Sequence, residues 1–179
     1  KAHEAGRAVV VCHVLRYTRF YAALEDLLRR GAVGKLETID AVEHVAYWHQ
    51  AHSFVRGNWR RPDETSPMIL QKSCHDMDIL RWLAGEPCLK VQSFGSLDFF
   101  NAENAPAGAA ERCLDGCRCK DACPYDAEKI YITSPRTGIR GRGKSWPCGV
   151  LASEPDEDKI RAALREGPYG RCVFHCDNS

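Results

Sequence analysis

Three side chains on one predicted helix could together move a proton. Lys72, His75 and Asp78 follow one another at intervals of three residues, so they would project from adjacent turns of a helix. A carboxylate beside an imidazole fixes the histidine tautomer and raises its basicity, which suits a general acid or base near neutral pH. The solvated face of an ordinary amphipathic helix can show the same spacing, so the residues alone leave both interpretations open.

The helix that carries these residues is predicted over 67–84. Ser66 is a suitable N-cap, and Pro67 is favoured at the first helical position. Gly85 supplies the stop signal at the other end. A helical period separates a broad apolar face from a polar one, which holds Gln71, Lys72, His75, Asp76 and Asp78.

The segment 49–65, before this helix, is polar and aromatic without a clear period, so it is predicted to be a long loop. Its side chains could stack on a ring and hydrogen-bond hydroxyls or phosphates. The candidate substrate-binding residues of this segment are His52, Asn58, Trp59 and Arg60.

Strands and helices are predicted to alternate through the rest of the chain. The unbroken apolar run from Ala8 to Val11, resumed at Val14 and Leu15, is typical of a strand buried in a parallel sheet. Other strands are expected at 35–48, 88–100 and 171–176, and other helices at 19–30 and 155–166. This pattern predicts an α+β (α/β) fold. The segment from 101 to 149 is expected to be mostly loop.

The order of several motifs resembles the Gfo/Idh/MocA family of nicotinamide-dependent oxidoreductases. A strand ending in "HVLRY" precedes a helix ending in "GAVGK", and "NWR" precedes a helix containing "CHDMDIL". His75 and Asp78 match the His-x-x-Asp pattern of the catalytic helix in that family. Trp59-Arg60 matches its Trp-Arg pair, and Val33-Gly34 matches its turn.

The resemblance implies a fold and a domain organisation. Residues 1–17 would end a Rossmann-type dinucleotide-binding domain, with Arg16 and Tyr17 facing substrate or cofactor. Residues 18–179 would form an incomplete C-terminal substrate and oligomerisation domain, with a largely antiparallel open sheet and a cysteine-rich insertion at about 101–149. We expect a piece of a longer protein, truncated at its C-terminus, that is inactive and binds no nicotinamide cofactor alone.

The resemblance also implies a reaction. The parent protein would use NAD or NADP to oxidise or reduce a hydroxyl carbon of a sugar, cyclitol or related polyol. His75 would move the hydroxyl proton, Asp78 would orient it, and Lys72 would assist electrostatically. The chain departs from the family pattern at Gln71, where an aspartate is usual, and at Ser66-Pro67, where glycines are usual. Alternatives are an NAD-dependent glycosidase of the same family, or a non-catalytic zinc-stabilised binding or scaffold domain.

Four of the ten cysteines stand within eleven residues, in "CLDGCRCKDAC". Four thiolates complete the tetrahedral coordination of a zinc ion, and a segment without its own hydrophobic core gains most stability from such a bound ion. We predict a zinc site of Cys113, Cys117, Cys123 and Cys172, with Cys119 as an alternative ligand. An iron–sulfur cluster and free thiols are the other interpretations.

Composition narrows the class of protein. The net charge of +1 gives no general attraction for nucleic acid or an anionic membrane. No apolar run approaches the roughly 20 residues that span a bilayer, and no signal peptide opens the chain, so a cytoplasmic protein is expected. The expected partners are a small carbohydrate-like substrate and a second copy of the chain, docked through the sheet face.

Overall fold

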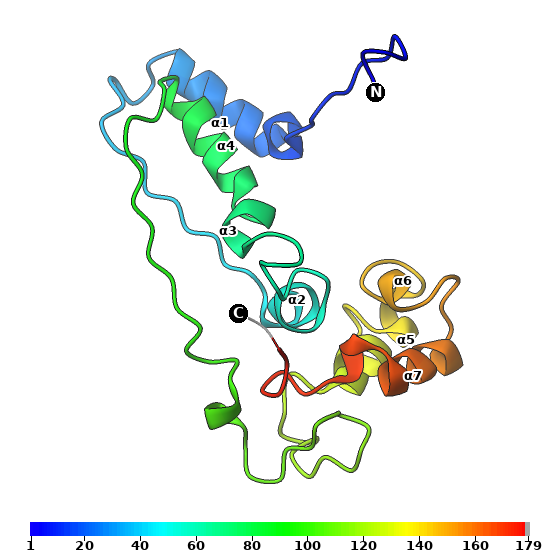
Figure 1. Cartoon of the computed structure of the whole chain (residues 1–179). Coiled ribbons are helices and arrows are strands. Elements are labelled where there is room, and N and C mark those ends of the chain that lie inside the picture. The colour runs from blue at the N-terminus through cyan, green and yellow to red at the C-terminus, as the bar shows by residue number, and fades with distance from the viewer. Residues whose placement is uncertain (178–179) are drawn as a thin grey trace. The chain divides into compact units, whose positions relative to one another are not determined.

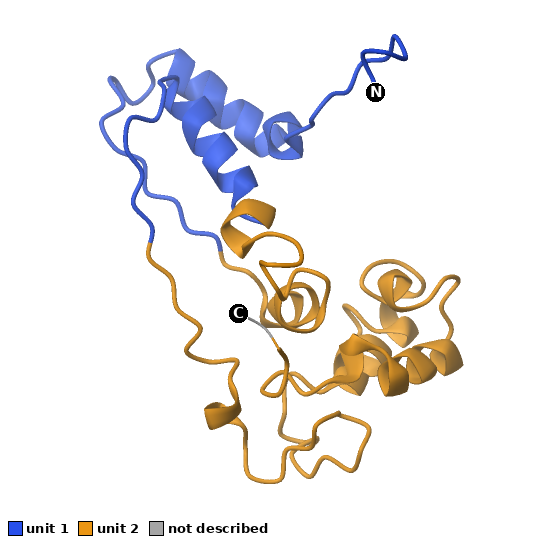
Figure 2. Cartoon of the chain, viewed as in Figure 1, with its two compact units in different colours: residues 1–43, 72–93 blue, residues 44–71, 94–179 orange. Residues whose placement is uncertain are grey.

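The computed structural model describes residues 1–177, and these form two compact units. The first unit contains residues 1–43 and 72–93, and the second contains residues 44–71 and 94–179, of which the last two are not described (Figure 2). The domain boundary expected at residue 17 stays a prediction.

Two helices and a short 3-10 turn, η1 (Val14–Tyr17), make up the ordered part of the first unit. Helix α1 (Arg19–Arg29) begins at Thr18, whose hydroxyl accepts a hydrogen bond from the backbone N–H of Tyr21. Helix α4 (Cys74–Ala84) ends at Gly85, which adopts the left-handed conformation. The predicted helix at 19–30 and the stop at Gly85 are therefore confirmed.

The helix predicted over 67–84 is interrupted. Its first part is α3 (Met68–Gln71), and α4 starts afresh at Cys74. Ser66 accepts a hydrogen bond from the side-chain amide of Gln71, and the N-cap residue of α4 is Ser73, which makes no side-chain capping bond. Lys72 therefore lies at the break between the two helices and not within a continuous helix.

The second unit is helical where a loop was expected. Residues 47–56 form α2 (Tyr47–Gln50) and a π-helical turn, η2 (Ala51–Arg56), so the prediction of an irregular loop from residue 49 is wrong for this part. Ala51, Val55 and Arg56 are each at most 1% exposed. Five of the six residues of this turn are buried, so it lies in the core of the unit.

The remaining elements of the second unit are short, apart from one amphipathic helix (Figure 1). Helix α7 (Glu157–Glu166) begins at Asp156, whose carboxylate accepts a hydrogen bond from the Lys159 N–H at 2.8 Å, so the helix predicted in this region is confirmed. The others are η3 (Ala102–Asn104), η4 (Lys129–Thr133), α5 (Ile139–Arg142), α6 (Cys148–Leu151) and η5 (Pro168–Gly170).

Two hydrophobic clusters form the core of this unit. One contains Ile130, Tyr131, Ile160 and Leu164, so it joins η4 to α7. The other joins η2 to the segment after η5, and its buried members are Ala51, Val55, Cys172, Val173 and Phe174. Packing of η2 against the C-terminal segment brings residues more than one hundred positions apart in the sequence into contact.

The predicted sheet is absent from the described residues, which corrects the expected α/β fold with its Rossmann strand and largely antiparallel open sheet. Within residues 1–177 the strand-like pairing is limited to an isolated antiparallel bridge between Arg112 and Arg171. The valines of the first predicted strand are exposed, with Val9 at 77% and Val11 at 79%. Leu89, in the third, is 90% exposed. β-Branched content favours an extended chain, but a strand exists only where a neighbour completes its hydrogen bonds.

None of the helices in the described part of the chain has the length and apolar composition of a membrane-spanning segment.

Candidate functional site

Within the first unit, η1 and α4 are joined by an ion pair between Arg16 and Asp78. Arg16 Nε donates to one carboxylate oxygen of Asp78 at 2.7 Å, and a terminal guanidinium nitrogen donates to the other. This hydrogen bonding holds the pKa of Asp78 below its usual range. The Arg16 guanidinium also lies 5.6 Å from the ring centre of Trp82, so it is fixed on two sides.

His75 lies one helical turn before Asp78. Its Nδ1 atom is buried and has no hydrogen-bond partner among the described residues. The ring of His13 approaches the His75 ring edge-on at 6.2 Å, and His13 Nε2 lies 3.8 Å from an Asp78 oxygen. His75 is thus placed beside a carboxylate already bound by Arg16, so the orientation of His75 by Asp78 stays a prediction.

Lys72 forms an ion pair with a residue that the sequence did not single out. Its Nζ atom donates to a carboxylate oxygen of Glu43, and the Lys72 side chain is 21% exposed. The backbone carbonyl of Lys72 accepts a hydrogen bond from the N–H of His75. Lys72 therefore contacts His75 through a backbone hydrogen bond. The positive charge of the Lys72 side chain is paired with the Glu43 carboxylate.

The candidate substrate-binding residues differ widely in exposure. Tyr17 is 79% exposed and Trp59 is 42% exposed, so both could contact a ligand. Asn58 is also exposed. Arg60 Nε donates to an Asp177 oxygen at 2.9 Å, and this pairing lowers the pKa of Asp177. Arg16, Tyr17, Lys72, His75 and Asp78 belong to the first unit, and His52, Asn58, Trp59 and Arg60 belong to the second.

His52 is a core residue. Its side chain is 2% exposed, its ring stacks on Tyr169 with centroids 4.8 Å apart, and its Nδ1 lies 3.0 Å from the Tyr131 hydroxyl. Burial, with smaller contributions from His49 and Arg56, lowers the pKa of His52 to about 4. The imidazole is therefore neutral at physiological pH and packs as an aromatic ring.

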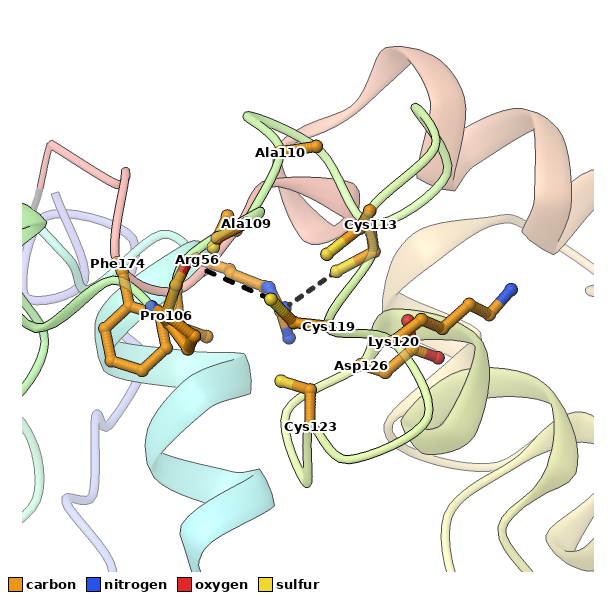
Figure 3. A pocket seen from close by; sticks show the side chains of 13 residues that line it. Arg56, Pro106, Ala109, Ala110, Cys113, Cys119, Lys120, Cys123, Asp126 and Phe174 are labelled. Atoms are coloured by element: carbon orange, nitrogen blue, oxygen red, sulfur yellow. Dashed lines mark hydrogen bonds between the residues drawn. The ribbon is translucent and has the colours of Figure 1, made fainter.

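Five cysteines of the second unit line one small pocket of about 20 Å³. They are the four residues of the predicted zinc site, Cys113, Cys117, Cys123 and Cys172, together with the alternative ligand Cys119. Figure 3 shows Cys113, Cys119 and Cys123 around the side chain of Arg56. Among residues 1–177, no three His, Cys, Asp or Glu side chains adopt an arrangement that holds a metal ion.

Arg56, Lys120 and Asp126 are the charged residues that line this pocket, and the role of Arg56 was not predicted. Arg56 is 1% exposed, and its Nη2 atom donates to the Cys113 sulfur at 3.4 Å (Figure 3). Burial raises the pKa of the Cys123 and Cys172 thiols, while the positive charge of Arg56 opposes that shift. The four-residue spacing from His52 to Arg56 is the helical signal that could have identified η2 and placed both side chains in the core.

Comparison with known proteins identifies the class. Residues 27–164 match the model of an oxidoreductase family, in its C-terminal alpha/beta domain. The chain belongs to this family, the Gfo/Idh/MocA oxidoreductases, so the predicted family is confirmed. The match carries an alpha/beta description although the described residues contain no strand.

A relative in Bacillus subtilis (strain 168), named "Putative oxidoreductase YteT", is 26% identical over 129 residues. The alignment covers 70% of this chain and 29% of YteT, so the chain spans less than a third of that relative. No solved structure matches the chain.

Proposed function

We propose that this chain is part of an NAD(P)-dependent oxidoreductase that acts on a hydroxyl carbon of a sugar, cyclitol or related polyol. Membership of an oxidoreductase family supports the reaction class. The observation that carries the proposal is His75, whose buried Nδ1 has no partner within residues 1–177 and lies on the helix turn next to the Arg16–Asp78 ion pair.

The described residues do not fit the dinucleotide itself. Residues 1–177 contain no strand followed by a glycine-rich turn and a helix, the arrangement that binds a pyrophosphate. We therefore assign none of these side chains to the cofactor, which another part of the protein would hold. When bound, a nicotinamide supplies the hydride acceptor or donor.

His75 would move the proton of the substrate hydroxyl. An unpaired buried polar nitrogen costs about 1–3 kcal/mol, and a substrate hydroxyl that reached Nδ1 would remove that cost. The ion pair with Arg16 lowers the pKa of Asp78 and so keeps its carboxylate ionised. A negative charge therefore stays near the imidazolium that would form when His75 takes the proton. Lys72, paired with Glu43, would position the start of α4.

The test is nicotinamide reduction by the full-length protein with a panel of sugars, cyclitols and polyols. His75→Ala should lower kcat by about 100-fold or more, the contribution typical of a positioned general acid or base. His3→Ala changes an exposed histidine of the same unit and should leave turnover unchanged.

Two results would contradict the proposal. Unchanged turnover in His75→Ala would remove His75 from the mechanism. Failure of the full-length protein to bind either nicotinamide cofactor would remove the reaction itself.

A further inference from the structure

We propose that Cys113, Cys117, Cys123 and Cys172 bind one zinc ion as thiolates, with the buried guanidinium of Arg56 as the neighbouring positive charge. The site lies entirely within the second unit and is independent of the proton chemistry assigned to His75.

The backbone places two of the four sulfurs on a common side. Arg112 and Arg171 form the isolated antiparallel bridge, and Cys113 and Cys172 each follow one of these residues. The Cys113 N–H donates to Gly170 at 2.9 Å and the Cys172 N–H donates to Glu111 at 2.8 Å, which fixes both backbones. Side chains next to a bridged pair point to the opposite face from that pair, so both cysteines face the pocket.

Cys117 and Cys123 enter the pocket from the connecting loop. Gly116, with φ of +72°, turns the chain just before Cys117, and the Cys123 N–H donates to the Cys119 carbonyl at 3.0 Å. The four sulfurs do not surround a single point as they stand. The proposal therefore requires rotation of cysteine side chains about χ1, which moves the sulfurs between staggered positions while the backbone stays in place.

Cys119 is excluded from the set by its own contacts. Its thiol donates to the carbonyl oxygen of Ala107 at 3.2 Å and lies 3.9 Å from that of Pro106. Cys176 is likewise engaged, since its thiol donates to the Cys172 carbonyl at 3.1 Å. A thiol that donates to a carbonyl is protonated, whereas a zinc ligand must be a thiolate.

Arg56 provides a second observation, a buried hydrogen-bond donor left free in this pocket. Its Nε donates to the Arg171 carbonyl at 2.7 Å, and its Nη2 donates to the Tyr125 carbonyl at 2.7 Å and to the Cys113 sulfur. Its Nη1 is buried without a partner among the described residues. Asp126, 1% exposed, is the carboxylate of the same pocket and accepts a hydrogen bond from the Lys129 N–H. Nη1 of Arg56 is thus a buried donor without an acceptor, which costs about 1–3 kcal/mol.

A zinc ion with four thiolates would supply an acceptor for that donor. Four thiolates outweigh the two positive charges of the ion, so the centre is doubly negative, and arginine N–H groups hydrogen-bond well to charged acceptors. Arg56 would then neutralise part of that charge and leave no buried donor unpaired. The same contacts explain why a guanidinium is tolerated at 1% exposure in a unit of this size.

The volume of the pocket favours a single ion. A void of about 20 Å³ admits one water-sized particle, because a water needs roughly 10–15 Å³ measured in this way. One zinc ion satisfies this limit, whereas an iron–sulfur cluster of several iron and sulfide ions does not. The loop from 105 to 125 contains no helix or strand, so an ion that ties it to Cys172 would stabilise it.

The experiment measures metal content in the full-length protein purified without chelators. Elemental analysis should find about one zinc per chain, and Cys113→Ser and Cys172→Ser should lose it. Cys119→Ser is the matched control, since it removes a thiol from the same pocket and should keep the zinc. Arg56→Met, which preserves all four ligands, should weaken zinc binding by about 10- to 100-fold in chelator competition, as expected for a group that hydrogen-bonds a ligand.

A second measurement uses the unaltered protein and so does not depend on the folding of any variant. Replacing the metal of the unaltered protein with Co²⁺ should produce thiolate-to-cobalt absorption bands in the near ultraviolet and the visible bands of a tetrahedral site. Protein that contains no zinc and gains no such bands with added Co²⁺ would overturn the proposal. Equal zinc loss in Cys119→Ser and Cys113→Ser, bound iron with sulfide, or disulfides between these cysteines would also overturn it.

Discussion

Arg16 donates hydrogen bonds to both carboxylate oxygens of Asp78, with Nε 2.7 Å from Oδ2. The pair joins η1, the turn before α1, to the middle of α4. Spacing along the helix suggested that Asp78 would serve His75, which lies one turn away. The paired guanidinium nitrogens of arginine match the geometry of a carboxylate, so a charge-assisted two-point contact engages both oxygens. The charge state and position of Asp78 therefore depend on a residue 62 positions earlier in the chain.

Arg16→Lys should release Asp78 from this two-point contact. Lysine cannot donate two parallel hydrogen bonds to one carboxylate, so the pKa of Asp78 should rise toward the usual value of about 3.9. An NMR titration that follows the chemical shift of the Asp78 carboxyl carbon measures this pKa. The depressed pKa stabilises the fold above about pH 3.9, and this stabilisation is lost as pH falls through the folded pKa. Arg29→Lys, at an exposed pair with Asp26, should leave Asp78 unchanged. An unshifted Asp78 in Arg16→Lys would refute the assignment.

We expect the lowered pKa of His52 to reduce the stability of the fold in mild acid. Its pKa is about 4 in the folded protein and about 6.5 when unfolded, so between these values the unfolded chain binds more protons. The free energy of unfolding should fall by on the order of 3 kcal/mol as pH drops from 6.5 to 4, and it should be insensitive to this residue above 6.5.

Urea unfolding at a series of pH values measures this loss. His52→Gln can keep a hydrogen bond to the Tyr131 hydroxyl but cannot titrate, so its unfolding profile should be flatter across the window. Parallel profiles for the two proteins would show that His52 is not buried in its neutral form.

Gly170→Ala should destabilise the second unit. A Cβ at this position would lie 1.7 Å from the backbone oxygen of Leu164, so η5 must move away from the end of α7. Overpacking of this kind costs about 1–3 kcal/mol, measured as the change in the free energy of urea unfolding. Gly95→Ala is the control, because nothing lies within 4 Å of the added Cβ and no more than about 0.5 kcal/mol is expected. Equal stability of the two variants would contradict the close approach.

Local signals in the sequence predicted the longer helices well. Gly85 ends α4 where it was expected, and Thr18 and Asp156 cap the predicted helices α1 and α7, because a capping contact needs only neighbours within a few residues. The break at Lys72 and the π-helical turn at Ala51–Arg56 were missed. Both make contacts with distant parts of the chain, the ion pair of Lys72 to Glu43 and the packing of η2 on Val173.

For the candidate site, too, the sequence predicted some features and missed those that depend on distant contacts. Residue order alone led to the oxidoreductase family and to a cluster of cysteines, since motif order and spacing are properties of the sequence itself. The position of Arg56 in the cysteine-lined pocket was not predicted, because its contacts are to Cys113, Tyr125 and Arg171, which are 57 or more positions away.

The sequence by itself determined the family, the capped helices and the positions of the cysteines, all of which rest on residues near one another in the chain. Only the tertiary structure decided that Arg16 binds Asp78, that His52 is a neutral core residue, and that Arg56 lies among thiols. It also decided that the segments predicted as strands at 8–15 and 88–100 form none in the described residues. The physical reason is that ion pairs, burial and strand ladders each need a partner that local sequence does not specify.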